Sequence, residues 1–274
     1  MPNYINNISA LSFAQQYNKV TPAINKSFQK IATGLRVPNA ATDTAAMSIF
    51  KKLEAENVSF QQALRNTNDG VSLVQTAEGT LDSANQILTR MRELSVQSSN
   101  GIYNQQDRDA LNTEFEQLRD EFDRISENAN FNDVPLFSGS GDVNLQVGGD
   151  ADPSNQISVS LDDLQMDSTT LGFAGASISS QSGASSAVSS IDSAIEAVNE
   201  RRSQLGATQN RLLQSYDTVS TYSENLSSTQ SNLVDLDYAL ESSVNSQFLL
   251  RQKALQATQI QARKMNQSAL AFIS

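Results

Sequence analysis

The second half of the chain carries an apolar residue at every seventh position. A seven-residue apolar repeat is typical of helices that pack along a shared seam. Within residues 183–273 only Gly206 interrupts, so the pattern predicts one helix of roughly 130 Å at 1.5 Å per residue. The repeat runs without a miss through Ile191, Val198, Leu205, Leu212, Val219, Leu226, Leu233 and Leu240.

Two earlier segments show the same helical spacing. No proline lies between Pro38 and Pro135, so this span can hold long helices. Either Asn104 or Asp107 could cap the second of them. Three heptad helices of unequal length predict an antiparallel bundle. The apolar positions are Leu53, Phe60, Leu64, Val71, Val74, Leu81, Leu88 and Met91 in the first helix, and Leu111, Phe115, Leu118, Phe122 and Ile125 in the second.

Residues 131–182 differ from the rest in being rich in glycine and in alternating apolar and polar positions. Apolar residues alternate over 143–147 and again over 157–161, with a Gly-Gly-Asp turn sequence between them. Alternation with turn residues predicts one β-hairpin on the bundle. Residues 177–193 are Ser-rich and are expected to form a loop that leads into the last helix.

Both chain ends are amphipathic, and each lacks an obvious partner except the other. Ile24, Phe28, Ile31 and Leu35 follow a helical spacing near the N-terminus. Such a pair would be marginal alone in water, so we expect the ends to fold together during assembly. The fold class is therefore mainly α: a long antiparallel coiled-coil bundle built from both ends, with one small β-hairpin region. The apolar C-terminal positions include Phe248, Leu255, Ile260 and Phe272.

Charge separates the ends from the middle. Residues 1–50 carry four Lys or Arg against one Asp, residues 245–274 carry four and no acid, and the whole 274-residue chain has a net charge of −11. A chain this acidic is a poor candidate for binding nucleic acid. No apolar run approaches the roughly 18 residues of a membrane span, and Met1–Asn7 show no signal-peptide pattern.

The composition leaves little room for catalysis. The chain has no Cys and no His, which excludes Cys/His zinc sites, disulfides and every Ser–His or Cys–His arrangement. Asp120, Glu121 and Asp123 cluster, but on a heptad helix they belong to the solvated face. No enzyme activity, cofactor or metal is expected.

Several ordered motifs are similar to those of the bacterial flagellins, and together they cover nearly the whole chain. What the resemblance implies is an extracellular filament subunit that is exported by a type III apparatus and polymerises for swimming motility. The motifs are GLRVPNAATDTAA at 34–46, NDGVSLVQTAEG at 68–79, RMRELSVQ at 90–97, LGATQNRL at 205–212 and ENLS at 224–227.

The resemblance also implies how the chain is divided. Residues 1–41 and 242–274 would form the filament's inner core, 42–137 and 183–241 the helical bundle of an outer tube, and 138–182 the hairpin and Ser/Gly-rich loop. The implied partners are further copies of the chain, the filament cap, the hook-junction proteins and an export chaperone. Inner-core assembly would fall to Ile24, Phe28, Ile31, Leu35, Phe248, Leu255, Ile260 and Phe272.

The 90–97 motif carries a second implication. In flagellins the matching segment is buried between protofilaments, and in some it is bound by the Toll-like flagellin receptor of vertebrates. The resemblance carries both roles to Arg90, Leu94 and Glu114. The alternative is that Leu94 belongs to the helical seam and Arg90 pairs with an acid on a neighbouring helix or subunit.

Two other functions compete with that of a filament subunit. A hook–filament junction adaptor of the same superfamily would have similar termini and would add one ring without extending. A signalling or secreted coiled-coil protein would need a membrane span or an output domain, and neither is visible in the sequence.

Overall fold

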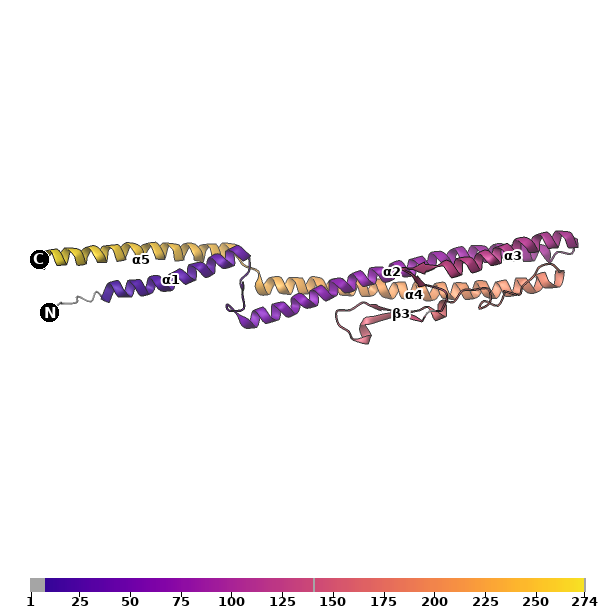
Figure 1. The fold of residues 1–274 in the computed structure, drawn as a ribbon, viewed down its shortest axis with the longest axis horizontal. Coiled ribbons are helices and arrows are strands. Elements are labelled where there is room, and N and C mark those ends of the chain that lie inside the picture. Colours follow the sequence, from indigo (N-terminus) through magenta and orange to yellow (C-terminus); the bar gives the residue numbers. More distant parts are fainter. Residues whose placement is uncertain (1–7, 140, 274) are drawn as a thin grey trace. The chain divides into compact units, whose positions relative to one another are not determined.

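Over the residues that the structure describes, the protein is mainly helical, with two small strand pairs (Figure 1). The computed structural model describes residues 8–139 and 141–273, and their side chains except those of 8–11, 13, 263 and 265–273. The elements are α1 (Ile8–Thr33), α2 (Thr44–Ser98), α3 (Gln105–Asn128), β1 (Asn130–Phe131), β2 (Val134–Pro135), β3 (Asp142–Gln146), a 3₁₀ turn (Pro153–Asn155), β4 (Gln156–Ser160), a second 3₁₀ turn (Asp162–Leu164), α4 (Gln181–Val234) and α5 (Tyr238–Ile273).

The chain divides into two compact units. The terminal unit comprises the described parts of Met1–Ala55 and Asn225–Ser274, and the bundle unit is Glu56–Glu224. In the terminal unit α1 and α5 lie side by side (Figure 1). None of the helices is both long enough and apolar enough to cross a membrane over the residues described.

The core of the bundle unit is a heptad seam shared by α2, α3 and α4. Asn85 of α2 donates to Asn199 of α4 at 3.0 Å, and Arg92 donates to Asp192, which fixes these two helices as antiparallel. The predicted bundle is therefore confirmed. Its fully buried apolar side chains include Val74, Leu81, Leu88, Met91, Phe115, Phe122, Ile191, Val198 and Leu212.

The start of α3 is set by a reciprocal pair of hydrogen bonds. Asn104 is the N-cap and accepts from the Asp107 backbone at 3.0 Å, while the Asp107 carboxylate accepts from the Asn104 backbone at 3.2 Å. Both capping candidates from the sequence thus take part in one capping box.

The predicted hairpin is present as β3 and β4, paired antiparallel with Val143 opposite Val159. A second pair, β1 and β2, was not predicted. Its two-residue turn is formed by Asn132 and Asp133, which adopt φ of 50° and 63°. Asn and Asp tolerate this left-handed backbone better than other non-glycine residues, so the pair could have been found from the turn residues.

The single helix predicted for 183–273 is wrong. α4 ends at Val234 and α5 begins at Tyr238. The seven-residue repeat fails at the same place, since Leu240 is 64% exposed. Asp237 caps the new helix by accepting from the Leu240 backbone at 3.0 Å.

The Ser-rich loop predicted for 177–193 is shorter than expected. α4 already begins at Gln181, and Ala184, Ala187 and Ile191 are buried on its seam. The small apolar residues between the serines continue the helical spacing, which outweighs the modest helix propensity of serine.

Gly70 marks the place where the β3–β4 hairpin approaches α2. A Cβ built on Gly70 would lie 2.4 Å from a terminal methyl of Leu145, whereas nothing lies within 4 Å of one built on Gly79. Gly70→Val is expected to displace the Leu145 side chain and to lower the free energy of unfolding by about 1 kcal/mol, the low end for overpacking, because the displaced methyl is the end of a flexible side chain. Urea unfolding measures it, with Gly79→Val as the matched control; equal effects at both positions would contradict the close approach.

Candidate assembly surfaces

The α1–α5 pair is held by a narrow seam that is only partly apolar. Val20 and Ile24 of α1 are buried, at 8% and 5% exposure, and Phe248 and Leu255 of α5 are half-buried. The seam also buries two polar side chains, Ser27 and Asn245, at 2% and 8% exposure. Within the described part of the chain, the Ser27 hydroxyl and the Asn245 carbonyl oxygen have no hydrogen-bond partner. Each such group costs stability, so the pair is weaker than an apolar seam of the same length.

Polar contacts along the seam fix which residues face each other. Lys30 Nζ lies 3.3 Å from the Glu241 carboxylate, and both side chains are less than a quarter exposed. Further along, Gln252 donates to the Thr21 hydroxyl at 3.5 Å. These contacts place the two helices antiparallel. Glu241 is the only acid in either helix, so this ion pair is the only one that α1 and α5 can form with each other.

The eight predicted inner-core residues take three kinds of position. Ile24 is buried, and Ile31, Leu35, Phe248 and Leu255 are half-buried in the terminal unit. Phe28 and Ile260 are instead 50% and 57% exposed. The side chain of Phe272 lies outside the described residues.

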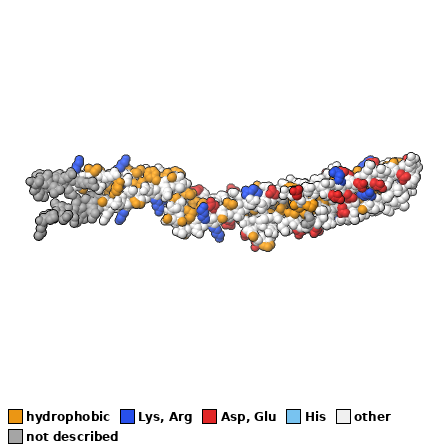
Figure 2. All heavy atoms as spheres, in the orientation of Figure 1, with side chains coloured by type: hydrophobic (Ala, Val, Ile, Leu, Met, Phe, Trp, Pro, Cys, Tyr) orange, Lys and Arg blue, Asp and Glu red, His pale blue; other side chains and the backbone are white. Residues whose placement is uncertain are grey.

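The terminal unit presents apolar side chains to solvent (Figure 2). Leu240 and Leu250, at 64% and 67% exposure, join Phe28 and Ile260 in this exposed set. Sequence reasoning did not find either leucine as exposed, because the seven-residue repeat placed Leu240 on the buried seam and Leu250 lies on no predicted seam position. A group of large apolar side chains exposed on one small unit is typical of an interaction surface.

Arg90, Leu94 and Glu114 lie in the bundle unit. Their arrangement is the alternative one, in which Leu94 belongs to the helical seam and Arg90 pairs with an acid on a neighbouring helix. Leu94 is 1% exposed and belongs to the core. Arg90 of α2 pairs with Glu114 of α3, Nη2 to Oε1 at 2.7 Å, and with Glu93 at 3.1 Å. Hydrogen bonds to Glu114 and then Glu93 raise the pKa of Arg90 above its usual value. Both Arg90 and Glu114 remain nearly half exposed.

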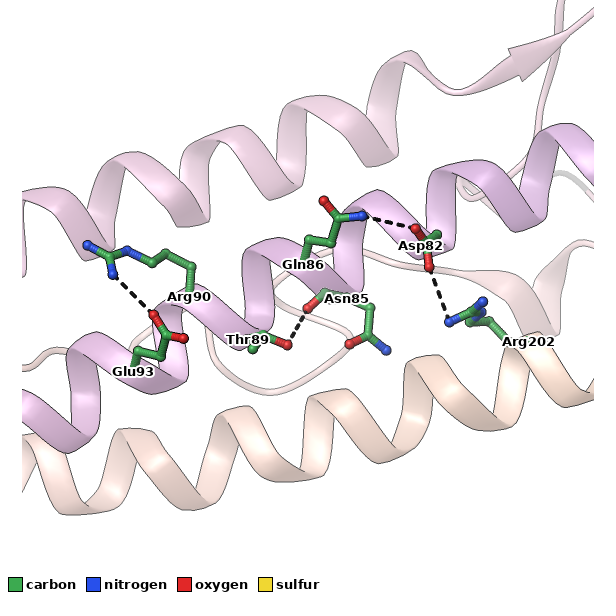
Figure 3. A pocket seen from close by; sticks show the side chains of 7 residues that line it. All are labelled: Asp82, Asn85, Gln86, Thr89, Arg90, Glu93 and Arg202. Carbon is green, nitrogen blue, oxygen red and sulfur yellow. Dashed lines mark hydrogen bonds and ion pairs between the residues drawn. The ribbon is translucent and has the colours of Figure 1, made fainter.

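Arg90 also borders a groove of about 410 Å³ (Figure 3). Arg202 reaches into it from α4, with Nη1 3.5 Å from Asp82. Among the described residues, no group of three or more acidic side chains is placed to hold a metal ion. The groove is a polar surface of mixed charge. Its lining is Asp82, Asn85, Gln86, Thr89, Arg90, Glu93 and Arg202.

Comparison with known proteins identifies the family. The model of the bacterial flagellin N-terminal helical region matches residues 5–142, and that of the C-terminal helical region matches 188–273. The flagellin of Halalkalibacterium halodurans is 39% identical over 249 residues, which cover 90% of this chain and 91% of that protein. This chain belongs to the bacterial flagellin family.

Two further matches agree with this family assignment. The flagellin of Bacillus subtilis is 31% identical, with 97% of this chain and 98% of that protein covered. The crystal structure of Bacillus cereus flagellin matches with a TM-score of 0.50 and 30% identity, over 57% of this chain and 88% of that one. As a flagellin, the chain is a structural subunit of the extracellular flagellar filament and not an enzyme.

A hook-associated relative shares the fold but not the sequence. The structure of a putative flagellar hook-associated protein from Vibrio parahaemolyticus has a TM-score of 0.59 at 17% identity, over 71% of this chain and all of that one. Flagellins are 30–39% identical to this chain in the matches above. The junction-adaptor alternative is therefore not favoured.

Proposed function

We propose that this flagellin polymerises by burying the outward apolar side chains of its α1–α5 pair against neighbouring copies. The observation that carries the proposal is the exposure of Phe28, Leu240, Leu250 and Ile260 on one small unit. Burying one such side chain completely contributes about 1.5–3 kcal/mol. No described element of the monomer covers these four side chains, so contacts between copies can bury apolar surface that the monomer leaves in water.

The same proposal assigns a role in the filament to each predicted segment. Residues 1–41 and 242–274 form the inner core, 42–137 and 183–241 the outer tube, and 138–182 lies outside both. Before assembly the apolar faces need cover, which is the role we assign to an export chaperone. The filament cap and the hook-junction proteins would meet the same faces at the two ends of the polymer.

Seeded polymerisation tests the proposal. Purified monomer is added to short filament fragments and examined by electron microscopy, beside truncations that lack 1–35 or 245–274. The full-length chain is expected to extend the seeds, and the truncations are expected to stay monomeric. Addition of a single terminal ring would favour the junction adaptor, and equal extension by the truncations would contradict the role of the termini.

We further propose that Arg90 and Glu114 form a contact between protofilaments and that the Toll-like flagellin receptor of vertebrates recognises the same pair. Two nearly half-exposed, mutually ordered charged groups support this, because their side chains are already fixed before a partner arrives. Leu94 acts from the core, by holding α2 against α3.

Arg90→Ala is expected to slow seeded extension and to weaken receptor activation by monomer, measured in a reporter assay. The matched control is Arg92→Ala, since Arg92 is on the same helix, is equally exposed and also pairs with an acid. Equal effects of the two variants on both readouts would contradict a specific role for Arg90.

A further inference from the structure

The segments that follow α1 and α4 end their helices against each other. Leu35 and Asp235 form an antiparallel bridge. The Arg36 backbone donates to the Val234 carbonyl at 2.7 Å, and the Leu236 backbone donates to the Gly34 carbonyl at 3.0 Å. We name residues 34–36 and 233–238 the terminal clasp.

Within the clasp each chain segment caps the helix of the other. The last carbonyls of a helix have no partner inside it. Arg36 Nη2 donates to the Leu233 carbonyl of α4 at 2.6 Å. In return the Tyr238 hydroxyl, from the first residue of α5, donates to the Ile31 carbonyl of α1.

The end of α1 has its own stop signal, whereas the end of α4 does not. Gly34 adopts φ of 71° and donates to the Lys30 carbonyl at 2.8 Å, the geometry of a glycine that ends a helix. Beyond Gly206 the sequence holds neither Gly nor Pro. The local signal for a break is Asp237, which caps α5. Asp237 starts the next helix but does not cap the Leu233 and Val234 carbonyls of α4, which accept instead from the side chain and the backbone of Arg36.

We propose that Arg36 and Tyr238 are positioning residues: they stop α4 at Val234 and align α5 with α1 for assembly. Without the clasp, residues 235–237 join α4 to α5 in one helix, as their sequence alone predicts. The Lys30–Glu241 ion pair lies close to the clasp along both helices, α1 and α5. The clasp therefore sets which residues face each other along the seam. This inference rests on the proposed role of the α1–α5 pair.

The test uses the absence of cysteine from the chain. Thr21→Cys with Gln252→Cys joins residues that touch in the aligned pair. Thr21→Cys with Gln259→Cys reports a pair displaced by one heptad. Each double variant is assembled on seeds and treated with a short thiol-specific cross-linker. Cross-linking within the chain is expected for the first pair and not for the second.

Arg36→Ala is then added to both, with Arg251→Ala, an exposed arginine of α5, as the matched control. Loss of one net hydrogen bond of ordinary strength corresponds to roughly fivefold in an equilibrium, so the ratio of aligned to displaced cross-links is expected to fall by about that factor or more. Backbone ¹³Cα shifts of residues 235–237 are expected to become helical in Arg36→Ala and to stay unchanged in Arg251→Ala.

Tyr238→Phe keeps the test decisive if Arg36→Ala fails to assemble, because it removes only the hydroxyl. The cross-link ratio is expected to fall in this variant as well. Wild-type ratios and ¹³Cα shifts in every variant that assembles would overturn the clasp. Failure of the parent cysteine variants to extend seeds would instead count against the proposed function, and failure of the aligned pair to cross-link in filaments that do form would overturn the alignment that the clasp is proposed to set.

Discussion

Phe122→Ala is expected to lower the free energy of unfolding of the bundle unit by about 3–5 kcal/mol, the range for removing a fully buried phenylalanine. Phe122 is 0% exposed and packs edge-to-face on Phe173, with ring centroids 5.2 Å apart. This contact ties α3 to the loop that precedes α4. The measurement is urea unfolding of the monomer, followed by circular dichroism.

Ile102→Ala is the control for that loss. Ile102 is 81% exposed, in the turn between α2 and α3, and its truncation is expected to change stability by less than about 0.5 kcal/mol. A loss below about 1 kcal/mol for Phe122→Ala would contradict the core described here, since ordinary buried truncations exceed it.

Ile24→Asp is expected to lower the rate of seeded extension by roughly tenfold or more, because a buried charge without a partner is costly. Ile24 is 5% exposed in the α1–α5 seam. The unfolding of the bundle unit is expected to stay unchanged, since Ile24 belongs to the terminal unit. Extension is followed by light scattering and electron microscopy.

Asn25→Asp is the matched control, because it places the same charge on the next residue, which is exposed. It is expected to extend seeds at close to the wild-type rate. Equal loss in both variants would show that charge on α1, and not burial in the seam, limits assembly.

Much of the bundle could be predicted from the sequence, because each helix carries its own regular spacing of apolar residues. Phe115 and Phe122 lie on the predicted face of α3, and Asn104 and Asp107 form the predicted cap. These features depend on residues close together in the chain. Local spacing and capping chemistry are therefore sufficient to find them.

The end of α4 could not be predicted from the same kind of pattern. The carbonyl of Leu233 is capped by Arg36, almost two hundred residues away in the sequence. The seven-residue repeat continues to Leu240 and predicts a helix where a distant segment stops it. A contact this remote leaves no periodic signal near the break.

The burial of the candidate assembly residues could be predicted only in part, for a related reason. Helical spacing placed Ile24 and Phe28 on one face, yet one is buried and the other half exposed. A single sequence indicates which face of a helix is apolar, but not how much of that face the partner helix covers. The amides at Asn245, Gln252 and Gln259, seven residues apart, are a signal that could have shown the seam of α5 to be partly polar.

The most direct test of the account is a cryo-electron microscopy reconstruction of the filament grown from purified chain. The α1–α5 pairs of successive copies are expected to form the innermost layer of the filament. Phe28, Leu250 and Ile260 should lie in contacts between copies, and Lys30 should remain paired with Glu241 of its own chain. A filament in which these three side chains face solvent, or in which copies touch through the bundle unit alone, would contradict it.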